Sequence, residues 1–78
     1  MLSELLKAMA QGLVQNPDEV SVTADEPDAE GVICYHLRVA EGDMGRVIGK
    51  QGRVAKAIRT VMRSAANRNG ENISVEIG

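Results

Sequence analysis

Apolar residues recur at helical spacing near the start of the chain. Leucine or methionine occupies positions 2, 5, 6, 9 and 13, with Ser3, Glu4, Lys7 and Gln11 between them. This period predicts an amphipathic helix over residues 2 to about 14, whose leucine and methionine stripe belongs to the core. The helix should end before Asn16-Pro17, because a residue that precedes proline disfavours the helical conformation.

Three later segments alternate apolar and polar residues with the period of two that is typical of half-buried strands. They cover residues 20–24, 33–39 and 73–77. An acidic, turn-rich stretch, residues 25–31, separates the first two, which are expected to form an antiparallel pair joined by an exposed loop. On the second strand Cys34, His36 and Arg38 should lie on the opposite side from the apolar residues, on a solvated or partly covered face.

Between the second and third strands the pattern is helical again. Asp43 is expected to cap a short helix over Met44 to Ile48. A second helix begins near Arg53, and the segment Asn67 to Gly70 ends it. On this second helix, apolar residues at positions 54, 57, 58, 61, 62 and 65 cluster on one side. Basic residues gather on the other side, namely Lys56, Arg59 and Arg63.

The expected elements therefore run α-β-β-α-α-β. A two-helix crossover should place the third strand parallel to the second and beside it. The prediction is an α+β fold of two layers, in which a mixed three-stranded sheet with the second strand in the centre carries the helices on one face.

The stretch between the two later helices, Val47 to Arg53, carries the strongest indication of a binding site. Gly49 and Gly52 enclose Lys50 and Gln51. Glycine at both ends lets the backbone take positive φ and approach another molecule closely, while Lys50 and Gln51 face outward. Because a helix starts where the loop ends, free N–H groups and the positive end of the helix dipole favour an anion there. A nucleic-acid backbone is the natural anion.

Short turns with glycine also join many helix pairs that bind nothing, so the loop pattern alone leaves an ordinary connection open. The distribution of charge favours ligand binding. Residues 44–70 hold seven basic residues and no acidic one, whereas residues 1–43 hold two basic and nine acidic residues and residues 71–78 hold two acidic ones. The net charge of −2 thus conceals a positive region that coincides with the loop and the second helix.

The remaining composition argues against several classes of function. A single cysteine and a single histidine cannot close a structural zinc site or a disulfide, so no metal and no cofactor are expected. Neither Cys34 nor His36 has a recognisable partner for nucleophilic catalysis, and we expect no enzyme. One tyrosine is the only aromatic residue, which argues against binding by base stacking.

The first residues show no basic stretch followed by an apolar core, and no apolar run is long enough to span a membrane. We therefore expect a cytoplasmic protein without a membrane segment. Its length suits one domain with a single small core.

Taken together, these features carry a family resemblance. Val47-Ile48-Gly49-Lys50-Gln51-Gly52-Arg53, with Ile58 after the loop, resembles the GXXG signature of KH domains. The order α-β-β-α-α-β resembles the type II, bacterial, KH fold. The likeness covers nearly the whole chain, so residues 1–78 are expected to form a single KH domain similar to the stand-alone bacterial KH-domain protein A family.

The resemblance implies a protein that binds single-stranded RNA, with the loop holding the backbone of about four nucleotides. The glycines would shape the loop, its two polar residues would lie against phosphates, and two apolar residues would help to floor the groove. The implied RNA-binding residues are Ile48, Gly49, Lys50, Gln51, Gly52, Arg53, Val54 and Lys56. The resemblance further implies a role as RNA chaperone or post-transcriptional regulator, a link to cell-shape control, and a homodimer or a heterodimer with a second KH-containing protein.

A competing hypothesis is a protein-interaction module whose KH fold dimerises and no longer depends on RNA. KH copies that have lost RNA binding tend to carry acidic or missing GXXG loops, whereas this loop keeps Lys50. Dimerisation is also compatible with RNA binding, because a second small site raises the effective concentration along one RNA.

Overall fold

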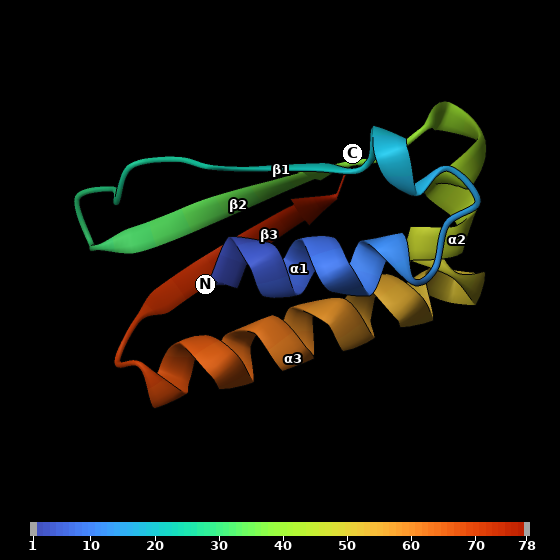
Figure 1. The fold of residues 1–78 in the computed structure, drawn as a ribbon. Coiled ribbons are helices and arrows are strands. Elements are labelled where there is room, and N and C mark those ends of the chain that lie inside the picture. Colours follow the sequence, from blue (N-terminus) through green and yellow to red (C-terminus); the bar gives the residue numbers. More distant parts are fainter. Residues whose placement is uncertain (1, 78) are drawn as a thin grey trace.

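Three α-helices and three strands follow one another in the order α1, β1, β2, α2, α3, β3, and the computed structural model describes residues 2–77 (Figure 1). Short 3-10 turns at Pro17–Glu19, Glu41–Asp43 and Lys50–Gly52 precede β1, α2 and α3. The bounds are Leu2–Gln11 for α1, Ser21–Ala24 for β1, Val32–Arg38 for β2, Met44–Ile48 for α2, Arg53–Arg68 for α3 and Asn72–Ile77 for β3.

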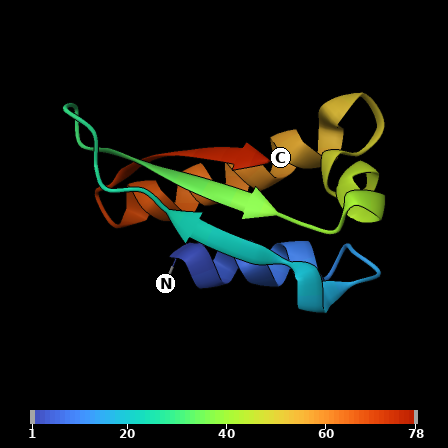
Figure 2. The ribbon, with the colours of Figure 1, turned by 90° about the horizontal axis from the view of Figure 1, so that it is seen from above.

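The sheet is mixed, with β2 in the centre. β1 runs antiparallel to β2, with Ser21 opposite Arg38, and β3 runs parallel to it, with Val32 opposite Asn72. α1 and α3 lie side by side on one face of the sheet, while α2 lies at the end of this layer and packs against α3 (Figures 1 and 2). The predicted α+β fold with two layers and a mixed three-stranded sheet is confirmed.

The core fills the space between the two long helices and the inner face of the sheet. Leu6 and Met62 contribute from the helices and Leu37 from the central strand, and all three side chains are fully buried. The alternation of β2 places Tyr35 and Leu37 inward, because successive side chains of a strand point to opposite faces. Within residues 2–77 no helix combines the length and the apolar character needed to cross a membrane.

The end of the first helix differs from the prediction. α1 ends at Gln11 rather than near residue 14, and residues 12 and 13 form a turn. Gly12 donates to the Ala8 carbonyl and Leu13 donates to the Ala10 carbonyl, so the last turn tightens before the chain leaves the helix axis. Leu13 continues the apolar stripe in sequence, which explains why periodicity alone extended the helix too far.

The predicted role of Asp43 was also wrong. Asp43 precedes α2, but its side chain makes no cap hydrogen bond to that helix. Its carboxylate is buried and accepts from the backbone N–H groups of Gln15 and Asn16, at 3.2 and 3.0 Å, and from the Asn16 side chain at 3.1 Å. Because the chain turns away after α1, these donors need an acceptor. Asp43 supplies it and joins the end of α1 to the start of α2.

The same contacts set the ionisation of Asp43. Burial alone would raise its pKa, but the hydrogen bonds from Gln15 and Asn16 and the charge of Arg46 outweigh burial, so the pKa lies below the ordinary 3.8. A carboxylate with a lowered folded-state pKa stabilises the protein above the unfolded pKa. This contribution is lost as the pH falls through the folded pKa.

We expect Asp43→Ala to lower the melting temperature at neutral pH by roughly 5–15 °C, because two part-buried backbone N–H groups lose their acceptor. The difference from the parent should begin to shrink as the pH falls below the ordinary 3.8, where Asp43 is protonated in the unfolded chain, and should shrink further as the pH falls through the lower folded-state pKa. Calorimetry over a pH series measures both effects. Glu41→Ala, which removes an exposed carboxylate from the same turn, is the control, and an equal loss in that variant would contradict the assigned role.

Candidate nucleic-acid interface

The connection between α2 and α3 is a tight loop built from three residues with positive φ. They are Gly49, Gln51 and Gly52, with φ of 76°, 58° and 75°. Gly49 donates to the Gly45 carbonyl and ends α2, and Gly52 donates to the Gly49 carbonyl across the loop. Within residues 2–77, Gln51 is the only residue other than glycine with positive φ. This conformation keeps Lys50 and Gln51 exposed at the tip, as the sequence predicted.

The two glycines are needed for different reasons. A Cβ at Gly49 would overlap the side chain of Val54 and lie 2.9 Å from its backbone nitrogen. Gly49 also combines φ 76° with ψ 174°, a region that only glycine occupies readily. A Cβ at Gly52 would meet nothing within 4 Å, so Gly52 is required for its left-handed backbone alone.

The N-terminus of α3 lies directly after the loop tip. Gly52 is the N-cap residue of α3, and no side chain caps the first turn of this helix. The N–H groups of Gly52 and Arg53 donate to the Gly49 and Lys50 carbonyls, so the remaining N–H groups of this turn and the positive end of the helix dipole are what favour an anion beside the loop. The structure thus brings Lys50, Gln51 and Arg53 together at one end of the molecule, all three exposed.

One side of α3 is basic and faces the edge of the sheet at β3. Arg59 donates to the Val75 carbonyl at 3.3 Å and lines a hollow of about 350 Å³ with residues at the carboxyl ends of β2 and β3. Arg63 lines a further hollow of about 220 Å³ beside Asn72 and Ile73. Five basic side chains of the loop and of α3 form no ion pair with a carboxylate of residues 2–77, namely Lys50, Arg53, Lys56, Arg59 and Arg63. Arg59 and Arg63 were not in the predicted site, although their spacing from Lys56 already placed them on its side of the helix.

The other side of α3 is apolar and faces α1. Val54 and Val61 line a hollow of about 280 Å³ with Met9 and Leu13 of the first helix and the turn after it. Val54 therefore lies near Gly49 but on the other side of α3 from Arg59. Ile48 is exposed at the end of α2, next to the loop. Of the two residues predicted to floor an RNA groove, Ile48 adjoins the loop tip, and Val54 supports the loop from behind.

The outer face of the sheet carries a group of side chains around His36 that sequence reasoning did not find. His36 Nε2 lies 2.8 Å from Asp25 Oδ2, and Nδ1 lies 3.1 Å from Glu76 Oε2. The hydrogen bond with Asp25 is the main reason that the pKa of His36 lies above its usual 6.5. The charges of Asp25 and Glu76 raise this pKa further, against partial burial and Arg38. The predicted solvated face is present, but His36 has one partner just after β1 and another on β3.

The fold and the loop together define a class: a KH domain, with a GXXG loop between two helices that follow a hairpin and precede a parallel strand. The sequence model of the KhpA/KhpB KH domain matches residues 3–77. The chain belongs to this KhpA/KhpB family of KH domains. The family resemblance inferred from the sequence is confirmed.

Individual relatives agree with this assignment. RNA-binding protein KhpA of Clostridium acetobutylicum is 50% identical over 76 residues, which cover 97% of this chain and 99% of that protein. RNA-binding protein KhpA of Listeria monocytogenes is 43% identical over 76 residues, with 97% of each chain covered.

Solved structures of Era show the same fold. Era of Aquifex aeolicus bound to GDP and AlF4⁻ superposes with a TM-score of 0.69, and Era in complex with MgGDPNP and nucleotides 1506–1542 of 16S ribosomal RNA with 0.72. Both are 22% identical to this chain and cover 97% of it, while the chain corresponds to less than a third of either Era protein, 29% and 28%.

The structure predicts unequal costs for the two loop glycines. Gly49→Ala should lower the free energy of unfolding by about 2–4 kcal/mol, because it adds a steric overlap with Val54 to an unfavourable backbone conformation. Gly52→Ala should lower the free energy of unfolding by only about 1 kcal/mol, because it adds the cost of a left-handed backbone conformation and no steric overlap. Urea unfolding of both variants measures the difference. Equal losses would show that the approach of Gly49 to Val54 does not constrain the loop.

Proposed function

We propose that this protein binds single-stranded RNA without catalysing a reaction, and that its GXXG loop clamps the backbone of about four nucleotides. The observation that carries the proposal is the position of Lys50 and Gln51. Both are exposed on a loop of unusual backbone conformation, directly before the uncapped first turn of α3. Phosphate is the group that such an arrangement binds best.

The charge of α3 gives the RNA a direction. From the loop, the RNA backbone continues past Lys56, Arg59 and Arg63, between this helix and β3. The hydrogen bond from Arg59 to the Val75 carbonyl holds its side chain beside the hollow, so little side-chain entropy is lost when RNA binds. The proposed site therefore comprises the eight predicted residues, with Val54 as a support for the loop, extended by Arg59 and Arg63.

The bases are held without aromatic stacking. Tyr35 is the only aromatic residue and is 8% exposed in the core, so it offers no ring to a base. Van der Waals contact with exposed Ile48 and hydrogen bonds to base edges remain as the means of reading the strand. Recognition of this kind gives a modest affinity for each short site.

The relatives support the proposal, because the KhpA proteins of Clostridium acetobutylicum and Listeria monocytogenes are named RNA-binding proteins. The complex of Era with part of 16S ribosomal RNA offers a fold-level parallel only. Action in the cytoplasm as an RNA chaperone or post-transcriptional regulator, with an influence on cell shape, extends the proposal along the line of the family resemblance.

A second candidate function is self-association, or pairing with another KH-containing protein, through the apolar side of α3. Val61 is 44% exposed and Leu13 is 38% exposed, and both border the hollow between α1 and α3. This surface lies on the other side of α3 from Arg59, so a dimer formed there leaves the basic side free for RNA. Two short sites on one RNA then bind more tightly than one.

A loop variant tests the proposal. Replacing Lys50 and Gln51 together with aspartate changes the local charge by three units and leaves both glycines in place. Since both side chains are exposed, the free energy of unfolding should change by no more than roughly half a kcal/mol. Filter binding to single-stranded RNA should fall at least about tenfold, because carboxylates replace the groups that meet the phosphates.

Lys7→Asp with Gln11→Asp is the matched control. It makes the same chemical changes on exposed positions of α1. RNA binding should stay within about twofold of the parent at a salt concentration that screens charges far from the bound RNA. Val61→Asp, examined by sedimentation and by RNA binding, separates the two candidate functions. A folded loop variant that binds RNA like the parent, together with loss of binding in Val61→Asp, would favour the interaction module over the loop clamp.

A further inference from the structure

Four potential metal ligands from three segments meet on the outer face of the sheet. Cys34 and His36 stand two residues apart on β2, so both side chains point to the same face. Asp25 follows β1, and its backbone N–H donates to the Cys34 carbonyl at 2.9 Å, which holds it opposite Cys34. Glu76 lies on β3 directly opposite His36. The sheet register alone therefore brings these residues together.

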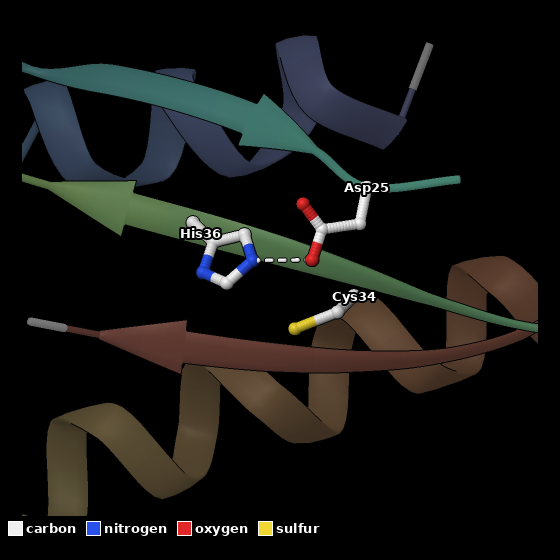
Figure 3. Close-up of side chains that lie close together, drawn as sticks. All are labelled: Asp25, Cys34 and His36. Carbon is white, nitrogen blue, oxygen red and sulfur yellow. Dashed lines mark hydrogen bonds and ion pairs between the residues drawn. The ribbon is translucent and has the colours of Figure 1, made fainter. Parts of the chain in front are cut away.

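The donor atoms lie close enough to share one ion. One carboxylate oxygen of Asp25, the thiol of Cys34 and a ring nitrogen of His36 all lie within 4.8 Å of one another. Figure 3 shows the carboxylate and the thiol both pointing toward the imidazole ring, on the same face of the sheet. We propose that these three side chains form a binding site for a divalent metal ion of the zinc class.

The chemistry of the donors selects this class. A thiolate, an imidazole and a carboxylate are the three ligand types that Zn²⁺ uses in proteins, whereas Mg²⁺ and Ca²⁺ require oxygen ligands. Three protein ligands leave the fourth position of a tetrahedral ion to water, so this is an open site rather than a closed structural one. The expectation of no metal counted only cysteine and histidine, and the sheet adds carboxylates to them.

Glu76 completes the arrangement from the other side of the ring. Its Oε2 lies 3.1 Å from His36 Nδ1, so Nδ1–H can donate to Glu76 while Nε2 faces Asp25. A carboxylate that receives the second N–H of a metal-binding histidine fixes the tautomer and the direction of the ring. Glu76 is therefore a positioning residue, and it also accepts a weak hydrogen bond from the Cys34 thiol at 3.7 Å.

The Asp25 side chain must move away from His36 to admit the ion. Ligand atoms around tetrahedral zinc lie about 3.4 Å apart, given bonds of about 2.0–2.2 Å to nitrogen and oxygen. The Asp25 oxygen now lies 2.8 Å from His36 Nε2, within a hydrogen bond that the ion would replace. The Asp25 side chain is 62% exposed, so it can rotate to lengthen the distance between its oxygen and His36 Nε2 without disturbing the core.

Cobalt titration of the untagged, reduced, full-length chain tests the site, because Co²⁺ bound to a thiolate absorbs in the near ultraviolet. We expect a saturable charge-transfer band at one Co²⁺ per chain, displaced by Zn²⁺. Cys34→Ser should abolish the band, and His36→Gln or Asp25→Asn should weaken binding by roughly a hundredfold. Glu76→Gln should keep the band and weaken binding by roughly tenfold.

Glu26→Gln is the matched control, since it removes a carboxylate next to Asp25 that lies outside the cluster, and it should leave the titration unchanged. A second measurement uses the parent chain alone: Zn²⁺ should slow the alkylation of Cys34. Absence of a band and of protection would overturn the proposal, as would a Co²⁺ affinity that is unchanged in His36→Gln or a band that needs two chains per ion. The aspartate variant of Lys50 and Gln51 should bind Co²⁺ normally, so failure of the metal site and failure of the RNA site can be told apart.

Discussion

The approach of Gly49 to Val54 is the constraint on which the functional end of this protein depends. Because no Cβ fits between them, the path by which the chain leaves α2 and enters α3 requires glycine at position 49. That path places Lys50 and Gln51 at an exposed tip and leaves the first turn of α3 without a side-chain cap. A backbone requirement at one residue thereby determines where the proposed phosphate site lies.

The fold then separates opposite charges in space. The acidic loop between β1 and β2 lies at one end of the molecule, and the GXXG loop lies at the other (Figure 1). Because α3 runs away from the GXXG loop beside β3, its basic side extends the positive region along the helix. Glu76 shares a hollow with Arg59, and Glu71 shares one with Arg63, so the separation is most complete at the loop itself. Asp43, one of the two acidic residues that flank this region in sequence, is buried and accepts hydrogen bonds from Gln15 and Asn16. A chain with a small net negative charge thus presents a positive surface to a polyanion.

Local patterns were enough to predict most of the architecture. The alternation of apolar and polar residues predicted the strands, and the apolar period predicted α3. The spacing of the two glycines located the loop. Each of these patterns depends only on residues that are close in sequence. One error is local, since Leu13 continues the apolar period beyond the end of α1. The other errors concern contacts between distant residues. Asp43 reads as a helix cap locally, yet its partners lie 27 and 28 residues away. The carboxylates beside His36 come from two other segments, and only the register of the sheet reveals them.

We propose that RNA meets the GXXG loop and the basic side of α3, not the apolar side that faces α1. Nuclear magnetic resonance of the ¹⁵N-labelled chain, titrated with a short single-stranded RNA of mixed sequence, tests this most directly. We expect the largest changes in amide chemical shift on residues 49–56, on Arg59 and Arg63, and on β3. Changes confined to the surroundings of Leu13 and Val61, or no changes at all, would contradict it.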